Sequence, residues 1–269
     1  MKNEIIVQFS GGIDSLYAAH HLAPRYDRVH LLTFDKGYLH LFLKANRSNV
    51  EILRKLHGED KIVHALLDIK PLFKKLGVES YGETRDAFGN EIAWCVPCRA
   101  SMALGSVLYA LENDIPAFTD GANWEQAPDG EKVLVTADNY PEFLEVIKAF
   151  AAAYKVSYLP LIYELNTRKE RRDELLALGA KIDFNSLDRP KKSVFDVFRK
   201  AFFKRSQPMC LSGYLIHWKR NLFNVKEELT PEMTVRGIEP KLGTVGRRLV
   251  DDYFAAKGLK AADLVRARG

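Results

Sequence analysis

The sequence predicts an α/β protein with a mostly parallel sheet that is covered by helices on both faces. Short apolar, strand-like runs alternate with helix-like segments from residue 4 to residue 179, and this alternation is typical of parallel sheets. The first run ends in a glycine turn, and polar residues follow later runs at Asp35 and at Asp120–Asn123. Ligands of such sheets bind beyond the carboxyl ends of the strands. We therefore expect one site where these strand ends meet.

Strands are expected at short apolar runs that are bounded by turn residues. The first run contains Ile5, Ile6 and Val7 and leads directly into the glycine turn. The expected strands are residues 4–9, 28–34, 61–69, 117–119 and 156–163.

Helices are expected where apolar residues recur with helical spacing. The last helix of the alternating region is stopped by Gly179. Residues 79–93 are polar and contain glycine, so we expect an active-site loop there. The expected helices are residues 13–23, 47–57, 71–76, 99–112, 141–153 and 168–178.

Two domains are expected, because the alternation of strands and helices stops near residue 185. Residues 1–184 form the expected catalytic domain, and residues 185–269 form a smaller, basic and mainly helical extension that carries the third cysteine. Within the extension we expect a helix at 193–204, an apolar segment at 211–218, a loop at 243–248 and a final helix at 249–257.

The composition is that of an ordinary globular chain, with 269 residues, 47% hydrophobic and 28% charged. Every apolar run is shorter than the roughly 20 residues that span a bilayer. The start lacks the architecture of a signal peptide, because residues 5–7 are too short an apolar run. Three cysteines are a low, odd count that argues against a disulfide framework. We therefore expect a soluble, cytoplasmic protein without membrane association.

The most informative segment reads SGGIDS and lies between the first strand and the first helix. The backbone N–H groups of such a turn, together with a helix N-terminus, bind anions. Gly11 and Gly12 allow a tight turn and leave no Cβ between the backbone and a phosphate. Ser10 and Ser15 add hydroxyl donors, and Asp14 could hold a divalent cation or orient the turn. Ordinary helix capping by Ser10 or Asp14 is the alternative interpretation.

The string SGGIDS resembles the S-G-G-x-D-S signature of the PP-loop ATP pyrophosphatases. This resemblance implies an adenine nucleotide alpha-hydrolase-like fold, which is a Rossmann-like three-layer sandwich. It also implies that ATP is split between its α- and β-phosphates, when a substrate carbonyl oxygen attacks the α-phosphorus and pyrophosphate leaves. The turn would hold the β- and γ-phosphates, Mg²⁺ would bridge phosphate oxygens, and a nucleophile would then displace AMP.

The three cysteines form a candidate metal or redox site. Cys95 and Cys98 form a C-x-x-C pair, and Cys210 is the only other cysteine. Such a pair can share a metal or an iron–sulfur cluster, or it can act as a redox dithiol. A closed Zn²⁺ site needs four ligands, and His217 is the nearest histidine that could complete three cysteines. Buried, unreactive cysteines are the remaining interpretation.

The order of the cysteines resembles that of transfer-RNA thiolating enzymes within the PP-loop group, and of sulfur-inserting enzymes that act on cofactor precursors. In several of these enzymes three thiolates hold a [4Fe-4S] cluster, which implies this metal-binding role for Cys95, Cys98 and Cys210. The cluster would leave one iron open to bind sulfide.

Looser similarities to the same enzymes extend over roughly residues 4–215. Residues 120–123 lie where relatives carry G-x-N or G-H-N. Residues 167–170 resemble a (T/S)-K-x-E segment, with Arg168 at the position of the lysine unless Lys169 substitutes for it. The resemblance implies catalytic roles for Asp14, Asp120 and Asn123. The implied nucleotide-binding residues are Ser10, Gly11, Gly12, Asp14, Ser15, Phe34, Asp35, Gly121, Arg168 and Lys169.

The formal net charge of +5 is unevenly distributed. The region Arg189–Arg220 contains nine basic residues and a single acidic one, Asp196. Such a region is a candidate RNA surface, although a solvated helix face has the same composition. Because the glycine turn begins close to the N-terminus, we expect any RNA contact to come from this region and from the tail. The expected partners are ATP, transfer RNA and a sulfur donor protein or sulfide, and a homodimer is left open.

The leading hypothesis is an ATP-dependent sulfurtransferase that adenylates the carbonyl of a transfer-RNA base or a small molecule and then inserts sulfur. A PP-loop amide or nitrile ligase, with ammonia as nucleophile and Zn²⁺ at the cysteines, is the alternative enzyme. A nucleotide-binding module without catalysis would not need three cysteines. A redox sensor would use Cys95 and Cys98 alone.

Overall fold

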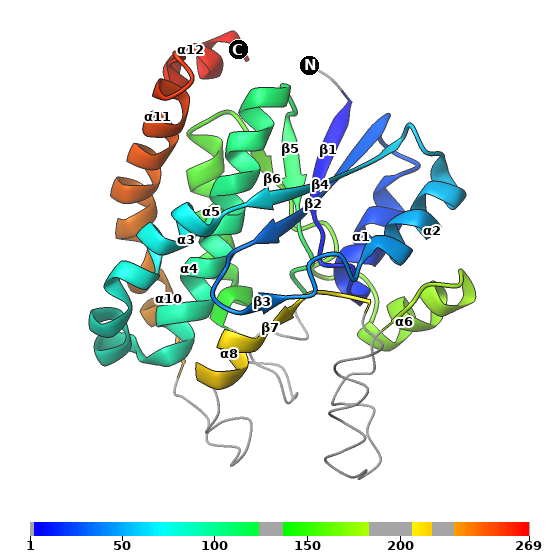
Figure 1. The fold of residues 1–269 in the computed structure, drawn as a ribbon, viewed down its shortest axis with the longest axis horizontal. Helices are drawn as coiled ribbons and strands as arrows, with labels where there is room; N and C mark the ends of the chain where they lie inside the picture. Colours follow the sequence, from blue (N-terminus) through cyan, green and yellow to red (C-terminus); the bar gives the residue numbers. More distant parts are fainter. Residues whose placement is uncertain (1–2, 124–136, 183–205, 217–228, 269) are drawn as a thin grey trace.

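The structure, a computed structural model, describes residues 3–123, 137–182, 206–216 and 229–268. Its centre is a five-stranded parallel sheet in the order β4–β2–β1–β5–β6 (Figure 1). The chain builds β2 and β4 on one side of β1 and then places β5 and β6 on the other side. The strands are β1 (Glu4–Gln8), β2 (Arg28–Asp35), β4 (Ile62–Asp68), β5 (Ala117–Thr119) and β6 (Ser157–Tyr158).

Helices cover both faces of the sheet, because its central strands are apolar on both sides. Ile5 and Val7 of β1 belong to the apolar cluster under α1, whereas Ile6 between them belongs to the cluster under α4, as the two-residue period of a strand requires. This is the predicted three-layer arrangement (Figure 1). One face carries α1 (Ile13–Leu22), α2 (Arg47–His57) and α6 (Arg168–Ala177), and the other carries α3 (Lys70–Leu76), α4 (Tyr81–Asn113) and α5 (Pro141–Ala152).

The predicted elements of the sheet agree with the observed ones to within one residue, except for the last strand. The strand expected at 156–163 is only Ser157–Tyr158. Pro160 has no N–H to extend the ladder, and the N–H of Leu161 donates to the carbonyl of Leu159 at 2.8 Å. The chain therefore turns away from the sheet just after Tyr158.

The active-site loop expected at 79–93 is wrong, because this segment is helical. A short turn, η1 (Val78–Ser80), leads into α4, which is kinked at Gly89 with φ of 86°. Beyond the kink, Ile92, Val96 and Ala100 recur every four residues and are fully buried. This stripe outweighs the polar composition of the segment. The C-x-x-C pair therefore lies inside a helix.

An antiparallel pair that the sequence did not predict joins β3 (His40–Leu41) to β7 (Met209–Cys210). His40 is the register partner of Cys210. Two residues per strand are too few for a periodic pattern to reveal. Helix α8 (Leu211–Ile216) follows and forms the described part of the predicted apolar segment at 211–218. The helix expected at 193–204 lies outside the described residues.

The C-terminal helices pack onto α4 and α5, as the red and orange part of Figure 1 shows. Ile238 and Phe254 are fully buried in the apolar cluster that contains those two helices. The loop expected at 243–248 is wrong, because Leu242, Gly246, Val250 and Phe254 recur every four residues and continue the helical path. The elements are η3 (Ala137–Asn139), α10 (Pro231–Lys241), η5 (Leu242–Gly246), α11 (Arg247–Ala255) and α12 (Ala261–Ala267), so the helix expected at 249–257 is not the last one.

One helical stretch, Lys70–Asn113, is long and apolar enough to cross a membrane by length and composition. However, 72% of its apolar window is buried inside the protein. A core helix of a soluble protein has the same properties, so this stretch is weak evidence for a membrane span.

Candidate active site

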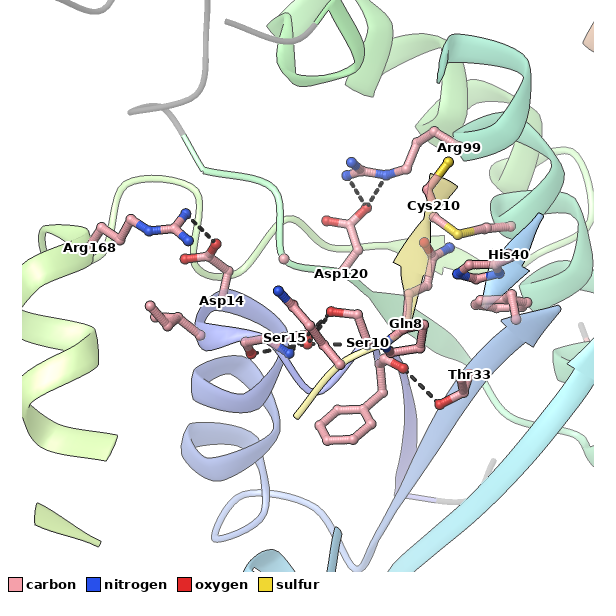
Figure 2. A pocket seen from close by; sticks show the side chains of 18 residues that line it. Gln8, Ser10, Asp14, Ser15, Thr33, His40, Arg99, Asp120, Arg168 and Cys210 are labelled. Carbon is pink, nitrogen blue, oxygen red and sulfur yellow. Dashed lines mark hydrogen bonds and ion pairs between the residues drawn. The ribbon is translucent and has the colours of Figure 1, made fainter. Parts of the chain in front are cut away.

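A cavity of about 370 Å³ lies at the carboxyl edge of the sheet, where β1 and β5 are neighbours although the chain builds β2 and β4 between them. Open α/β sheets bind ligands at such switch points. Figure 2 shows that the lining side chains come from both sides of this edge. Among the predicted residues, those that line the cavity are Ser10, Gly12, Asp14, Ser15, Phe34, Asp120, Gly121, Arg168 and Cys210.

Hydrogen bonds between its own residues hold the glycine turn in shape. Ser10 Oγ accepts a hydrogen bond from the N–H of Gly12 and lies 3.2 Å from Ser15 Oγ. Ser15 Oγ donates to the carbonyl of Gly12 at 3.3 Å. Within the described residues no side chain caps α1 at Gly12. The N–H groups of the first turn of α1 therefore keep their capacity to bind an anion.

Both glycines of the turn have close neighbours. Gly11 has φ of 80°, a conformation that side chains rarely adopt, and a Cβ there would lie 2.5 Å from Asn46 Cβ and 2.8 Å from the Ser206 carbonyl oxygen. A Cβ at Gly12 would lie 2.3 Å from Gln207 Oε1. The segment that leads to β7 therefore lies directly against the glycine turn.

Asp14, in the first turn of α1, is held by two arginines of α6. Its carboxylate oxygens lie 3.3 Å from Arg168 Nη1 and 3.2 Å from Arg171 Nε. The side chain of Arg171 is fully buried and donates to the carbonyls of Leu165 and Asn166 at 2.7 and 2.8 Å. Asp14 thus ties α1 to α6.

Residues 167–170, TRKE, form the N-terminus of α6 through a capping box. Thr167 accepts the N–H of Glu170, and the carboxylate of Glu170 accepts the N–H of Thr167 at 2.7 Å. This start places Arg168 in the cavity lining, whereas Lys169 is exposed. Of the two candidates for the lysine of the PP-loop enzymes, Arg168 is the one at the cavity.

Asp120, just after β5, is the centre of a buried charge network. Arg99 donates to Asp120 Oδ2 from Nη2 at 2.5 Å and from Nε at 3.2 Å, and it donates to Asp138 from Nη1 at 3.3 Å. The hydroxyl of Tyr158 donates to the same oxygen of Asp120 at 2.8 Å. Burial lowers the pKa of Arg99, but Asp120, Tyr158 and Asp138 raise it well above its ordinary value. Arg99 is therefore a permanent cation in the cavity (Figure 2).

The turn after Asp120 runs close to α1. A Cβ at Gly121 would lie 3.1 Å from both Asp14 Cβ and the backbone nitrogen of Ser15, so a small residue is needed there. Asn123 is fully buried, and its Nδ2 donates to the carbonyl of Gly121 at 3.3 Å. Asn123 is outside the lining of the described cavity.

The carboxyl end of β2 contributes Phe34 to the cavity, while Asp35 turns to other partners. Asp35 accepts the N–H of Gly37 at 2.8 Å and lies 2.7 Å from Lys70 Nζ. Burial raises the pKa of Asp35, but Lys70 and the N–H of Gly37 lower it overall. Within the described residues, its carboxylate is therefore part of an ion pair beside the cavity.

The three cysteines form one electrostatic cluster around Lys36. Cys95 and Cys98 are three positions apart on α4 and so share a helix face, while Cys210 lies on β7. All three thiols raise the pKa of Lys36, and Lys36 in turn lowers the pKa of Cys210. No disulfide joins the three cysteines, all of which the structure describes. The fold thus brings together sulfurs that are far apart in the sequence.

The three thiols differ in acidity. Burial raises the pKa of Cys98 to about 11, although Lys36 opposes the shift, and burial raises the pKa of Cys95 well above its ordinary value. Burial acts on Cys210 in the same direction, but Lys36 and the N–H of Gly213, which is 3.2 Å from Sγ, lower its pKa overall. Cys210 is therefore the cysteine whose thiolate is most favoured.

Lys36 follows β2 and is a buried cation with only 3% of its surface exposed. Its Nζ lies 5.1 Å from the ring centroids of both Phe73 and Trp94, which is within the range of cation–π contacts. Burial lowers the pKa of Lys36, but the nearby thiols raise it overall. Burial and the charge of Lys36 lower the pKa of His40, which lines the cavity, to about 4. Lys36 is thus charged and His40 neutral at neutral pH.

Three cysteine thiolates are a donor set of the kind that holds iron–sulfur clusters. Thiolates are the usual cluster ligands, and each binds a different iron, so they need not converge on one point. Within the described residues no three or more His, Cys, Asp or Glu side chains are arranged as a single-ion site. His217, the candidate fourth Zn²⁺ ligand, lies outside the described residues.

Sequence reasoning missed several residues that shape the site. Arg99 directly follows Cys98, and its place beside a candidate metal pair could have identified it. Gln207 and Lys36 gave no such signal, because each lies near the site only through pairing of distant segments. Arg171 resembles any charged residue of an exposed helix until its burial is known.

No protein-family profile matches the chain. Among solved structures, the chain is similar to a 4-thiouridine synthetase in complex with RNA and bound ATP, with 16% sequence identity and a TM-score of 0.51. The match covers 91% of this chain and 53% of that one, so the chain spans about half the length of the synthetase. It is also similar to a predicted subunit of a tRNA methyltransferase from Methanocaldococcus jannaschii, with 14% identity, a TM-score of 0.41, and coverage of 65% of this chain and 75% of that one. The likeness to the synthetase shows that the chain has the adenine nucleotide alpha-hydrolase-like fold, which confirms at the level of the fold the predicted resemblance to the PP-loop ATP pyrophosphatases.

Proposed function

We propose that the protein is an ATP-dependent sulfurtransferase that adenylates a substrate carbonyl, releases pyrophosphate and then inserts sulfur at the same carbon. The observation that carries this proposal is a single cavity lined both by the glycine turn and by Cys210. A shared cavity lets the activated carbonyl meet a sulfur nucleophile at short range and away from water.

The glycine turn supports the placement of ATP. The β- and γ-phosphates would lie against the N–H groups of the first turn of α1, with the hydroxyls of Ser10 and Ser15 as further donors. Arg168 adds a positive charge from the start of α6. These donors would stabilise the charge that grows on the leaving pyrophosphate. Phe34, at the end of β2, would face the adenine.

Mg²⁺ would enter with the phosphates. Asp14 is paired with Arg168 and Arg171, and Asp120 is bound by Arg99. Because both carboxylates already hold guanidinium groups, they fit poorly as direct ligands of a cation. Mg²⁺ at nucleotide sites is bound largely by phosphate oxygens and water. We therefore assign Asp14 to orienting the turn.

Adenylation would take place beside Arg99 and Asp120. The carbonyl oxygen attacks the α-phosphorus, the bond from that phosphorus to the bridging oxygen breaks, and pyrophosphate leaves with the electron pair. Arg99 would stabilise the negative charge of the α-phosphate and Asp120 would orient the substrate. The buried Asn123 would act from behind the cavity, by holding the turn that carries Gly121. Hydrosulfide then forms the carbon–sulfur bond, the carbon–oxygen bond breaks and AMP leaves. The nitrogen beside the carbonyl releases its proton to water when the oxygen is adenylated. The proton of hydrosulfide then ends on that nitrogen, so no oxidant is needed.

Cys95, Cys98 and Cys210 would hold the [4Fe-4S] cluster, which supplies an open iron for sulfide when it is bound. Lys36 supports this assignment, because a buried cation beside the three cysteines offsets the negative charge of three thiolates. Partners of this kind tune metal-binding thiolates.

The comparison supports RNA as the sulfur acceptor, because the similar synthetase structure contains both RNA and ATP. The basic region Arg189–Arg220 would contribute to RNA binding, and only its residues 206–216 are described. A boundary near residue 184, a cytoplasmic location and a sulfur donor protein or sulfide complete the proposal.

The test uses protein that is purified without oxygen. Iron, acid-labile sulfide and zinc are measured, and pyrophosphate release from ATP is followed with unthiolated transfer RNA and sodium sulfide. We expect about four irons per chain and pyrophosphate release that depends on the RNA. About one zinc per chain, with release that depends on ammonium, would assign the ligase alternative instead.

Gly12→Val is the control variant for this experiment. Its side chain enters the position expected for a phosphate, so ATP affinity should fall by about 100-fold or more, as the loss of one or two charge-assisted hydrogen bonds predicts. Circular dichroism should show an intact sheet, because the turn lies at its edge. Wild-type ATP affinity in this variant would overturn the assignment of the turn.

A further inference from the structure

We propose that Gln207 donates a hydrogen bond to the phosphates of ATP and thereby couples occupancy of the glycine turn to the position of Cys210. This inference rests on the proposed function, because it requires ATP at the turn. Gln207 lies three positions before Cys210 in the chain. It would be a positioning residue that links the two halves of the reaction.

The segment that carries Gln207 lies directly on the glycine turn. The Ser206 carbonyl oxygen lies 2.8 Å from the position of a Cβ at Gly11, and Gln207 Oε1 lies 2.3 Å from that of a Cβ at Gly12. Gln207 and Cys210 also line the same cavity (Figure 2 draws its lining). A ligand that binds beside Gly12 would therefore contact the carboxamide of Gln207.

A carboxamide is suited to this contact. It carries two N–H donors on Nε2 and an acceptor on Oε1, without a charge of its own. Rotation about the terminal bond exchanges the two ends, so Nε2 can face a phosphate without any movement of the backbone. Arg168 lines the same cavity from the start of α6. Gln207 would thus add a neutral donor from a segment that is far from the turn in sequence.

The connection between Gln207 and Cys210 is short and well fixed. Pro208 restricts the backbone directly after Gln207, and β7 follows at once, paired with β3. The N–H of Leu211 donates to the carbonyl of Leu39 at 3.1 Å. A phosphate that holds Gln207 would therefore also hold Cys210 in register with His40. Cys210 would be fixed in the cavity when ATP is bound, which is when a substrate can be activated.

Titration calorimetry with ATP and Mg²⁺ tests the phosphate contact. Gln207→Ala should bind ATP about tenfold more weakly, because it loses one hydrogen bond to a charged group. Gln207→Glu should bind more weakly still, because its carboxylate repels the phosphates. Leu215→Ala, an exposed position on the same segment, is the matched control and should bind as wild type does. Wild-type or tighter binding by Gln207→Ala would overturn the proposal.

Hydrogen exchange measured by mass spectrometry tests the coupling. In wild-type protein, ATP should slow exchange several-fold in peptides from the glycine turn and also in peptides covering residues 206–216. In Gln207→Ala, ATP at saturation should protect only the turn. Wild-type protein in which ATP protects the turn but not residues 206–216 refutes the coupling and leaves the proposed function intact. Protein in which ATP protects neither region refutes both. If Gln207→Ala does not fold, the wild-type experiment still decides.

Discussion

The two ends of the site are built in different ways, and of the cysteine end only Cys210 lines the cavity. The turn end, residues 10–15 with Arg168, rests on a single strand–turn–helix unit and one helix start. The cysteine end, Lys36 with Cys95, Cys98 and Cys210, is assembled from the end of β2, from α4 and from β7. A site built from one continuous segment can be recognised in the sequence. A site assembled from distant segments can be recognised only once the pairing of those segments is known.

The two ends also differ in electrostatics. At the turn end, the partly buried carboxylate of Asp14 pairs with the guanidinium groups of Arg168 and Arg171. At the cysteine end, Lys36 has no carboxylate within ion-pair distance among the described residues, and its neighbours are thiols and aromatic rings. A buried cation of this kind calls for a compensating anion. The cysteine end is therefore suited to anionic sulfur.

The largest expected effect is the loss of iron binding without loss of ATP binding, which would show that the two ends of the site act independently. Cys98→Ala should lose bound iron and sulfur insertion, because one of three thiolates is removed. Its ATP affinity should stay within about twofold of wild type, because the turn is untouched. Iron analysis and titration calorimetry measure the two properties.

Ser101→Ala is the matched control for Cys98→Ala, since Ser101 is a buried small residue one turn further along α4. It should keep its iron. Full iron content in Cys98→Ala would show that Cys98 is not a ligand of the cluster. Global unfolding of that variant would show that the metal has a structural role.

The next effect concerns the stability of the turn end. Arg171→Met removes one of the two arginines bound to Asp14 and leaves two carbonyls without their donor. Breaking a buried ion pair on one side should lower the free energy of unfolding by about 3 kcal/mol, as urea denaturation can measure. Lys169→Met, an exposed change on the same helix, should stay within about 0.5 kcal/mol of wild type. A loss below about 1 kcal/mol for Arg171→Met would mean that Arg168 alone ties α6 to α1.

The smallest expected effect is a pH dependence at the cysteine end. Burial and Lys36 lower the pKa of His40 from 6.5 to about 4, so below about pH 6.5 the unfolded chain binds this proton more readily than the folded one. The stability that neutral His40 contributes is present above pH 6.5 and is lost as the pH falls towards 4. His40→Gln should therefore gain stability relative to wild type between pH 7 and pH 4.5 in urea denaturation. Parallel pH profiles for the two proteins would show that His40 titrates normally.

The sequence predicts the sheet and the glycine turn because both depend on short-range patterns. Residues 4–23 contain a buried strand, a turn and a largely buried helix in order, and the residues that define each of them are neighbours in the sequence. The helix at 81–113 was only half predicted, because Gly89 and its polar neighbours look like a loop until the core that buries Ile92 is known. The β3–β7 pair and the burial of Lys36 arise from long-range pairing, which no local pattern encodes.

The part of α4 after the Gly89 kink carries two adjacent functional side chains, Cys98 and Arg99, whose positions depend on the same helical turn. Cys98 faces Lys36 and the other thiols, while the next residue, Arg99, binds Asp120. Each added or deleted residue would turn the rest of the helix by about 100° and carry both groups away from their partners at once. Insertions and deletions among relatives are therefore expected before Gly89 or after Asn113, and the stretch from Gly89 to Arg99 should keep a constant length.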